Sequence, residues 1–163
     1  MAGTLYVVAT PIGNLEDITL RALRVLRECP LVAVEDTRRT AKLLSAHGLS
    51  ARTVSFHAHN SRARVPQLLA RLESGFDVAL VSDAGTPGVS DPGLELVQAC
   101  VEKGIQVDAV PGPSAPLTAL VASGFPPVPF SFLGFPPRQP GLRAAWLREA
   151  FRTAHTWCFF EAP

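Results

Sequence analysis

The 163-residue sequence has few of the features that mark membrane or secreted proteins. No stretch approaches the ~20 consecutive apolar residues of a transmembrane helix. The amino terminus lacks the basic flank and the long apolar stretch of a secretory signal peptide. We therefore expect a cytoplasmic protein with no membrane partner.

Cysteine is scarce. Cys29, Cys100 and Cys158 lie far apart among apolar residues. Their odd number and wide spacing argue against a disulfide framework and against a zinc site, and favour reduced thiols in the core. We expect no metal ion.

Neither sign of charge predominates, with 15 Lys and Arg residues against 14 Asp and Glu residues. This balance excludes a wholly basic nucleic-acid-binding chain and an acidic tail, while 47% hydrophobic residues suffice for a globular core. Positive charge collects in residues 1–75, which hold 10 basic and 6 acidic side chains, whereas residues 76–163 hold 5 and 8. An anionic partner is therefore expected to bind the first half of the chain.

Strand-like and helical patterns alternate five times. Apolar runs typical of buried strands cover residues 5–9, 31–34, 53–56, 78–81 and 105–110. Each run is followed by a polar or glycine-rich loop and then by helical periodicity, which predicts an α/β fold with a parallel five-stranded sheet and helices on both faces. The carboxyl ends of the strands then share one edge, where open α/β sheets bind ligands.

Helix starts are predicted from capping residues. Asn14 is expected to cap the helix after the first strand, and Asp91 with Pro92 to begin the helix after the fourth.

The pattern changes near residue 124. Proline and glycine clusters at 124–127 and 135–141 flank a short strand at 130–133, and a helix at 143–151 and a strand at 156–160 follow. This change predicts a first domain over 1–123. Because two strands and one helix cannot close a core of their own, the rest is expected to pack on the first domain, pair with a partner or be a truncated piece. Residues 124–163 are expected to be a linker and the start of a second, incomplete α/β domain.

The loop at 82–91 carries the strongest chemical signal. Ala84, Gly85 and Gly88 allow a backbone to approach a ligand closely, and Asp83 places a carboxylate at a strand end. No Gly-x-Gly-x-x-Gly follows the first strand and no Gly-Lys-Ser/Thr follows any loop. Dinucleotide binding and phosphate cradling are therefore disfavoured.

A second loop, at 112–116, partly resembles the nucleophile elbow of hydrolases, but Pro116 stands where that motif needs glycine. A hydrolase with Ser114 as nucleophile and His57 as base stays an alternative. The favoured interpretation is that Ser114 is a helix-end hydroxyl that bonds a ligand or the backbone.

Two further loops at this edge carry charged or titratable side chains. His57 and His59 face the same side of a strand extension, with no nearby Cys, Asp or Glu to complete a metal site. Arg38 and Arg39 follow the second strand, where they could grip a phosphate or could simply be a charge cluster at a helix start.

The residues at 11–14, 82–93 and 110–115 resemble the motifs of the tetrapyrrole methylase-like, or class III, methyltransferases, which use S-adenosylmethionine. The stretches at 35–40 and 56–60 are similar to the signature of one subgroup, the cytidine-2′-O-methyltransferases of small-subunit (16S) ribosomal RNA. The resemblance runs in collinear order from Leu5 to Pro163, although family members are markedly longer. It implies a homodimer that holds the methyl donor between two domains and acts on ribosomal RNA or the 30S particle.

The resemblance also implies roles for individual residues. The donor site would comprise Pro11, Gly13, Asp83, Ala84, Gly85, Thr86, Gly88, Val89, Pro111, Gly112, Ser114 and Ala115. Candidates for binding RNA are Thr37, Arg38, Arg39, Asn60, Arg62 and Arg64. Candidates for taking or orienting the proton of the ribose hydroxyl are Asp36, His57 and His59.

Two rival functions stay open, since fold and donor site do not fix the acceptor. One is C-methylation of a tetrapyrrole, and the other is a noncatalytic binding module of the same fold.

Overall fold

A computed structural model describes residues 1–161 and divides the chain into two compact units, Met1–Ser114 and Ala115–Pro163. Residues 162 and 163, the last two of the segment for which an incomplete second domain is predicted, lie outside the described residues.

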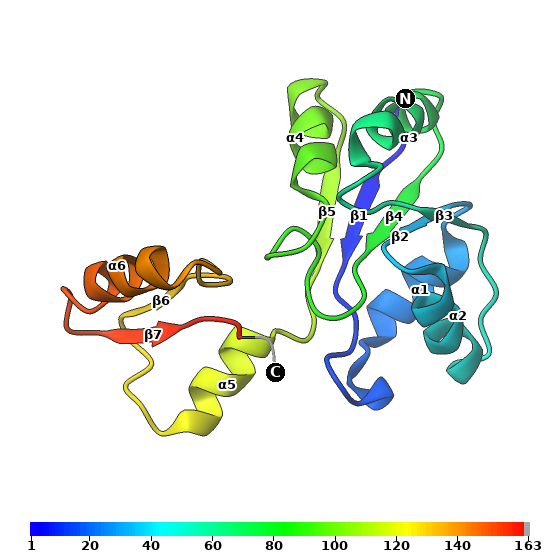
Figure 1. Cartoon of the computed structure of the whole chain (residues 1–163). Helices are drawn as coiled ribbons and strands as arrows, with labels where there is room; N and C mark the ends of the chain where they lie inside the picture. Colours follow the sequence, from blue (N-terminus) through cyan, green and yellow to red (C-terminus); the bar gives the residue numbers. More distant parts are fainter. Residues whose placement is uncertain (162–163) are drawn as a thin grey trace. The chain divides into compact units, whose positions relative to one another are not determined.

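A five-stranded parallel sheet forms the centre of the N-terminal unit (Figure 1). Its strands are β1 (Leu5–Val8), β2 (Val32–Val34), β3 (Thr53–Ser55), β4 (Val78–Val81) and β5 (Val107–Val110). They lie in the order β3-β2-β4-β1-β5, and every neighbouring pair is parallel. The predicted sheet is therefore confirmed, and all five strand ends meet at one edge.

Helices cover both faces of this sheet, as the sequence predicts. They are α1 (Leu20–Glu28), α2 (Thr37–Ala46), α3 (Ser61–Glu73) and α4 (Leu94–Glu102). Successive strand residues point to opposite faces, so Val8 packs in a core with α1 and α2, whereas Leu5 and Val7 pack in a second core with α3 and α4. The two cores hold the sheet between helical layers and fix the strand ends that carry the loops.

The predicted cap of the first helix is wrong in its position. Asn14 caps a single turn of 3-10 helix, η1 (Leu15–Asp17), by accepting a hydrogen bond from the N–H of Glu16 (3.1 Å). Ile18 is extended and ends that turn, so α1 begins only at Leu20. Its cap is Thr19, whose hydroxyl accepts from the N–H of Ala22 (3.1 Å).

The start of α4 also differs from the prediction. Asp91 and Pro92 do not begin the helix, whose first residue is Leu94 and whose cap position is Gly93. Gly93 has φ +142° and Ser90 has φ +64°, values that a right-handed helix does not allow. The chain therefore turns over 88–93 before the helix can form.

The C-terminal unit contains α5 (Ala115–Ser123), α6 (Pro140–Ala150) and a parallel two-stranded sheet of β6 (Phe130–Phe132) and β7 (Thr156–Cys158). The boundary between the units lies at residue 114, nine residues before the predicted end of the first domain. The difference arises because α5 packs on β7, with the Cys158 Sγ 4.0 Å from the carbonyl oxygen of Pro116. Within residues 1–161, no helix has the length and apolar character to cross a membrane.

Candidate functional site

Three loops from distant parts of the sequence meet at the carboxyl edge of the sheet. Thr10 and Gly85 form an antiparallel bridge, in which the N–H of Thr10 donates to Gly85 (2.9 Å) and the N–H of Gly85 donates to Thr10 (3.0 Å). The hydroxyl of Thr10 also donates to the carbonyl of Ser82 (3.1 Å). A Cβ built on Gly85 would lie 3.6 Å from Ile12 and 4.0 Å from the carbonyl oxygen of Pro113. The loops at 10–14, 82–91 and 111–114 are therefore adjacent, as the sequence predicts.

Two glycines make this approach possible. Gly85 has φ +80°, a conformation that residues with a Cβ rarely adopt. A Cβ on Gly112 would lie 2.9 Å from the Cβ of Ala9, closer than two carbons can pack. Both positions therefore need glycine for the loops to sit this close to β1.

The predicted donor-site residues differ in exposure. Pro11 and Gly85 are buried. Asp83, Thr86, Gly88, Ser114 and Ala115 are half-buried, and Gly13, Ala84, Val89, Pro111 and Gly112 are exposed. Ala115 is the first residue of the C-terminal unit. The eleven others lie in the N-terminal unit, where the buried and half-buried residues adjoin exposed ones on the same loops.

Side chains join the end of β2 to the end of β4. The N–H of Asp83 donates to Glu35 Oε2 (3.2 Å), and the N–H of Asp36 donates to Asp83 Oδ1 (3.0 Å). Arg39 Nε lies 3.5 Å from Asp83 Oδ2. Both carboxylate oxygens of Asp83 therefore have a partner, and its backbone is held as well.

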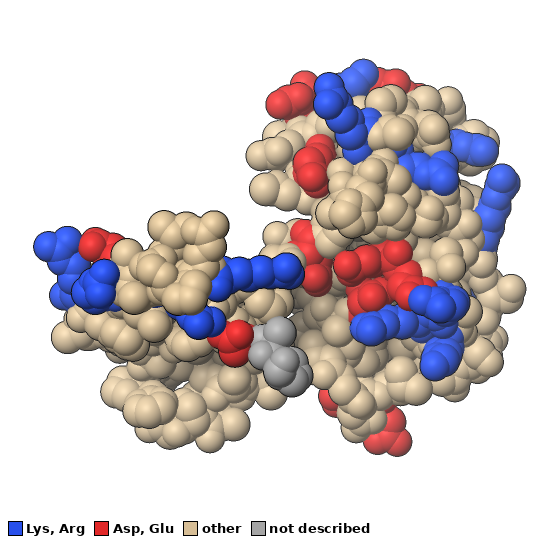
Figure 2. Space-filling view, in the orientation of Figure 1, with Lys and Arg blue, Asp and Glu red and all other residues tan. Residues whose placement is uncertain are grey.

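Carboxylates gather around this junction, beside basic side chains (Figure 2). Burial raises the pKa of Glu35, and the charges of Asp83 and Asp91 raise it further. Burial also raises the pKa of Asp91, although a hydrogen bond with Ser82 opposes the shift. Both residues lie within motifs that the sequence singles out, but Glu35 was given no role and Asp91 only that of a helix cap. The available signal was that Glu35 directly follows a buried strand, as Ser82 and Asp83 do.

Asp36 is the N-cap of α2 and is paired with a neighbouring arginine. Its Oδ1 accepts from the N–H of Arg38 (2.8 Å), and its Oδ2 lies 3.0 Å from Arg38 Nη2. The hydrogen bonds from Arg38 lower the pKa of Asp36 to about 2. The carboxylate is therefore a weak proton acceptor.

His57 and His59 do not lie on a strand extension, because β3 ends at Ser55 and residues 58–60 form a turn, but their ring centroids are 6.0 Å apart in an edge-to-face arrangement. Asn60 organises this turn, because its Oδ1 accepts from the N–H of His57 (2.9 Å) while its Nδ2 lies 3.2 Å from His57 Nε2 and from the Ser55 carbonyl. The buried Nδ1 of His57 has no hydrogen-bond partner within residues 1–161, so no Ser114–His57 pair forms there. This arrangement does not support the hydrolase alternative.

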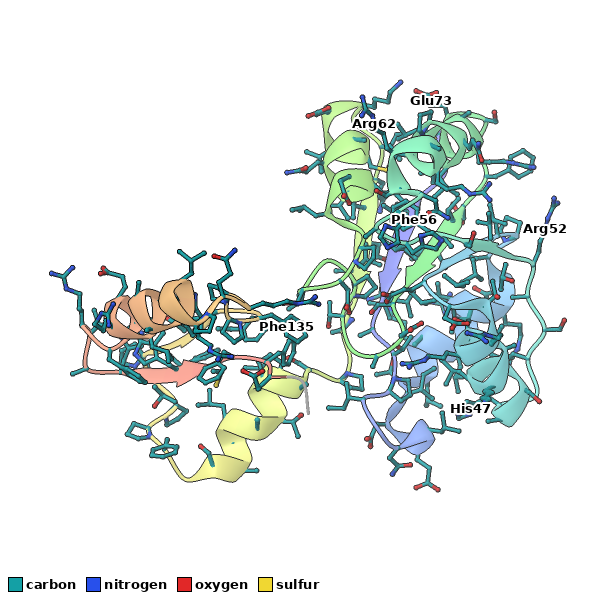
Figure 3. All side chains as sticks on the ribbon, viewed as in Figure 1. His47, Arg52, Phe56, Arg62, Glu73 and Phe135 are labelled. Carbon is teal, nitrogen blue, oxygen red and sulfur yellow. The ribbon has the colours of Figure 1, made fainter. Side chains whose placement is uncertain are left out.

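Three of the predicted RNA-binding arginines are largely exposed at helix starts on this edge. The side chain of Arg38 is 88% exposed and that of Arg39 is 67% exposed, so both remain accessible despite their ion pairs. Arg62 lies exposed on the first turn of α3 (Figure 3). Arg64 is half-buried and donates to Gln67 Oε1 (2.8 Å), and Thr37 is the exposed first residue of α2.

Two hollows bear on ligand binding. A hollow of about 70 Å³ lies between the first loop and α2, lined by Thr10, Pro11, Leu15, Arg39, Thr40, Leu43, Ser82 and Asp83. It is much smaller than the ~300–1,000 Å³ of typical cofactor pockets, so this hollow does not hold a whole cofactor. An apolar hollow of about 550 Å³ is lined wholly by the C-terminal unit, from Phe125 to Phe159, and contains none of the predicted site residues.

The polar groups at this edge suit a ligand without phosphates. The loops supply backbone groups, hydroxyls and carboxylates rather than a phosphate cradle, and the N-terminal rim is anionic at Glu35, Asp83 and Asp91. Among the described residues, no group of three or more His, Cys, Asp or Glu side chains is placed to hold a metal ion. A cationic or neutral nucleoside fits this chemistry better than a nucleotide.

The family model for tetrapyrrole (corrin/porphyrin) methylases matches residues 4–163. The chain belongs to this family. A crystal structure of the tetrapyrrole methylase uroporphyrin-III C-methyl transferase from Thermus thermophilus, in complex with S-adenosyl homocysteine, matches with a TM-score of 0.60 at 25% identity, over 83% of this chain and 60% of that one.

Relatives with curated names are more similar in sequence. The ribosomal RNA small subunit methyltransferase I of Halalkalibacterium halodurans is 50% identical over 99% of this chain and 56% of its own length. The protein of the same name from Micromonospora olivasterospora is 52% identical over 99% of this chain and 52% of its own length. The chain thus spans about half the length of these relatives.

Proposed function

We propose that the protein is an S-adenosylmethionine-dependent methyltransferase that modifies the 2′-hydroxyl of a cytidine in small-subunit ribosomal RNA. The observation that carries the proposal is identity of about 50% along 99% of the chain with relatives named ribosomal RNA small subunit methyltransferase I. Identity to the uroporphyrin-III C-methyl transferase is only 25%, which favours RNA over a tetrapyrrole as acceptor.

The converging loops support a donor site at the sheet edge. S-adenosylmethionine supplies an electrophilic methyl group on a sulfonium when it is bound. The backbone around Gly13, Gly85 and Gly112 would hold it, since these loops meet and leave room for close approach. The carboxylate of Asp83 adds a fixed negative charge beside them. The chain's main contribution is then to position the reacting groups and exclude water.

His59 is the best candidate for accepting the proton of the ribose hydroxyl. Asp36 is a weak acceptor because Arg38 holds its pKa at about 2. The ring of His57 accepts from Asn60 at Nε2, which leaves the proton of a neutral ring on Nδ1. That Nδ1 is buried, so His57 would act through the turn that it shares with Asn60, whereas the exposed His59 can take the proton.

The arginines at the starts of α2 and α3 are placed to bind phosphates of the RNA. Arg38, Arg39 and Arg62 lie on the first turns of α2 and α3, which follow the carboxyl ends of β2 and β3. There they would hold an RNA strand with one ribose near the methyl group. An rRNA substrate also implies a cytoplasmic enzyme. A homodimer belongs to the same proposal.

Transfer of a tritiated methyl group tests the function directly. The complete gene product is incubated with labelled donor and with 30S particles, naked 16S rRNA or uroporphyrinogen. Labelled 2′-O-methylcytidine in either RNA sample is expected, and label in the tetrapyrrole alone would overturn the proposal. If no acceptor were labelled and calorimetry showed no donor binding, the noncatalytic binding module would be the remaining interpretation.

The same assay tests the histidine roles. His59→Ala is expected to lower kcat by at least about a hundredfold, which is the usual contribution of a general base. His57→Ala and Asp36→Ala are measured beside it at saturating substrates. If all three variants retained wild-type transfer, the proton-acceptor proposal would be wrong.

A further inference from the structure

The ends of β2 and β4 are joined by side chains where their backbone pairing stops. Val34 and Val81 are the last paired residues of the two strands. Beyond them, the N–H of Asp83 donates to the carboxylate of Glu35 (3.2 Å), and the N–H of Asp36 donates to the carboxylate of Asp83 (3.0 Å). Each strand end thus supplies a carboxylate to the backbone of the other.

This reciprocal pair fixes the first residue of the loop at 83–91. Asp83 Oδ2 lies 3.5 Å from Arg39 Nε while Oδ1 accepts from Asp36, so the Asp83 side chain has one orientation. The Asp83 side chain is 22% exposed, and Asp83 lines the same hollow as Thr10 and Pro11. Its backbone, however, is held by Glu35 alone among these groups.

Glu35 makes this bond in an unfavourable setting. It is half-buried, and burial together with the charges of Asp83 and Asp91 raises its pKa. The N–H of Asp83 and the charge of Arg39 oppose the shift only in part. Residues that break the local electrostatic pattern in this way tend to lie at functional sites.

We propose that Glu35 is a positioning residue, whose carboxylate holds the N–H of Asp83 and so fixes the loop at 83–91 in the shape that binds the methyl donor. The donor part of this inference rests on the proposed function, whereas the loop part does not. In this role Glu35 acts through the backbone of Asp83 and not on the reacting atoms.

Two substitutions separate the bond from the charge. Glu35→Ala removes the acceptor and leaves the N–H of Asp83 without a partner. Glu35→Gln keeps an oxygen that can accept the same bond and removes the like charge. Glu73→Ala is the matched control, because Glu73 lies on the last turn of α3 (Figure 3). Its side chain is 47% exposed and pairs with Lys103.

The first measurement is amide hydrogen exchange over 82–91 in the complete gene product without donor. Removal of a hydrogen bond to a charged acceptor changes the equilibrium between the bonded and the open state by roughly tenfold or more. Glu35→Ala is therefore expected to raise the exchange rate of the Asp83 amide by about that factor. Glu35→Gln and Glu73→Ala should match the wild type. Unchanged exchange in Glu35→Ala would overturn the positioning role, whatever happens to donor binding.

The second measurement is donor affinity by calorimetry, at a temperature where thermal unfolding shows every variant folded. Glu35→Ala is expected to raise the Kd for S-adenosylmethionine by roughly tenfold and to leave the KM for RNA unchanged, with rescue by Glu35→Gln. Faster exchange with an unchanged Kd would overturn the link to the donor. A wild type that binds no donor would overturn the proposed function and that link together, while the exchange result would still decide the loop role.

Discussion

At Asp36, one carboxylate both caps a helix and pairs with an arginine. Hydrogen bonds from Arg38 lower its pKa from 3.8 to about 2, so the folded chain favours the ionised form. The stability from this group is therefore present above about pH 4 and is lost as the pH falls toward 2.

Asp36→Asn is expected to reduce the loss of stability at acid pH. Asparagine caps a helix as well as aspartate does but carries no titrating charge. The thermal unfolding temperature of the variant should fall less between pH 4 and pH 2 than that of the wild type. Asp17→Asn, on the exposed turn η1, serves as control and should follow the wild type. Equal slopes for wild type and Asp36→Asn would contradict the pairing.

Gly112→Ala tests the close approach of the third loop to β1. The added methyl would meet the Cβ of Ala9 at 2.9 Å, and overpacking of this kind costs about 1–3 kcal/mol. Urea denaturation should show that loss. Gly141→Ala is the matched control, since Gly141 lies inside α6 with open space at its Cβ, and alanine there should be neutral or stabilising. A wild-type midpoint for Gly112→Ala would show that the loop can move aside.

At the scale of elements, the capping of α1 gives a direct test. Thr19→Ala removes the hydroxyl that accepts from the N–H of Ala22 and is expected to cost about 1 kcal/mol. Thr19→Ser keeps an equivalent oxygen and should retain most of the stability. Denaturant unfolding of both variants measures the difference, and equal loss in both would mean that the hydroxyl is not the cause.

The strands were predictable to within two residues because a buried strand must be apolar on both faces, as Val78–Val81 is. The helix starts were not. Asn14 and Asp91 are both residues that cap helices, but the backbone after each one turns again before the helix begins. Sequence pattern identifies a possible cap, whereas the φ and ψ of the following residues decide whether the helix starts there.

The whole molecule concentrates its basic side chains in residues 1–75. Arg38 and Arg62 lie on the first turns of the helices that follow β2 and β3, whereas Arg52 precedes β3 and so lies at the opposite edge of the sheet. Charge at the first edge is therefore expected to matter for RNA binding and charge at the second is not.

The double variant Arg38→Ala and Arg62→Ala tests whether RNA binding depends on these two arginines. The logarithm of the RNA-binding constant falls linearly with the logarithm of the salt concentration. On single-stranded RNA, the slope becomes less negative by about 0.7 for each phosphate that the protein no longer neutralises. The double variant should therefore bind RNA more weakly, with a slope shallower by about 1.4 and with donor affinity unchanged. Arg52→Ala should retain the wild-type slope. A normal slope in the double variant would exclude both arginines from the RNA path.

The meeting of the three loops was predictable from topology, because parallel strands place their ends together. The contacts within the site were not. Nothing in the spacing indicates that Glu35 accepts from the backbone of Asp83, because that bond depends on β2 and β4 being neighbours in space. The division of the chain at residue 114 was missed for a similar reason, since only the packing of α5 on β7 assigns that helix to the second unit.

The bridge between Thr10 and Gly85 is antiparallel, whereas the strands that precede these loops are parallel. Two backbone hydrogen bonds join the loops, so a shift of one loop alone would have to break them. Any molecule that immobilises one of them lowers the entropy of both in a single event. The bridge therefore couples the loops before η1 and after β4, although more than seventy residues of chain separate them.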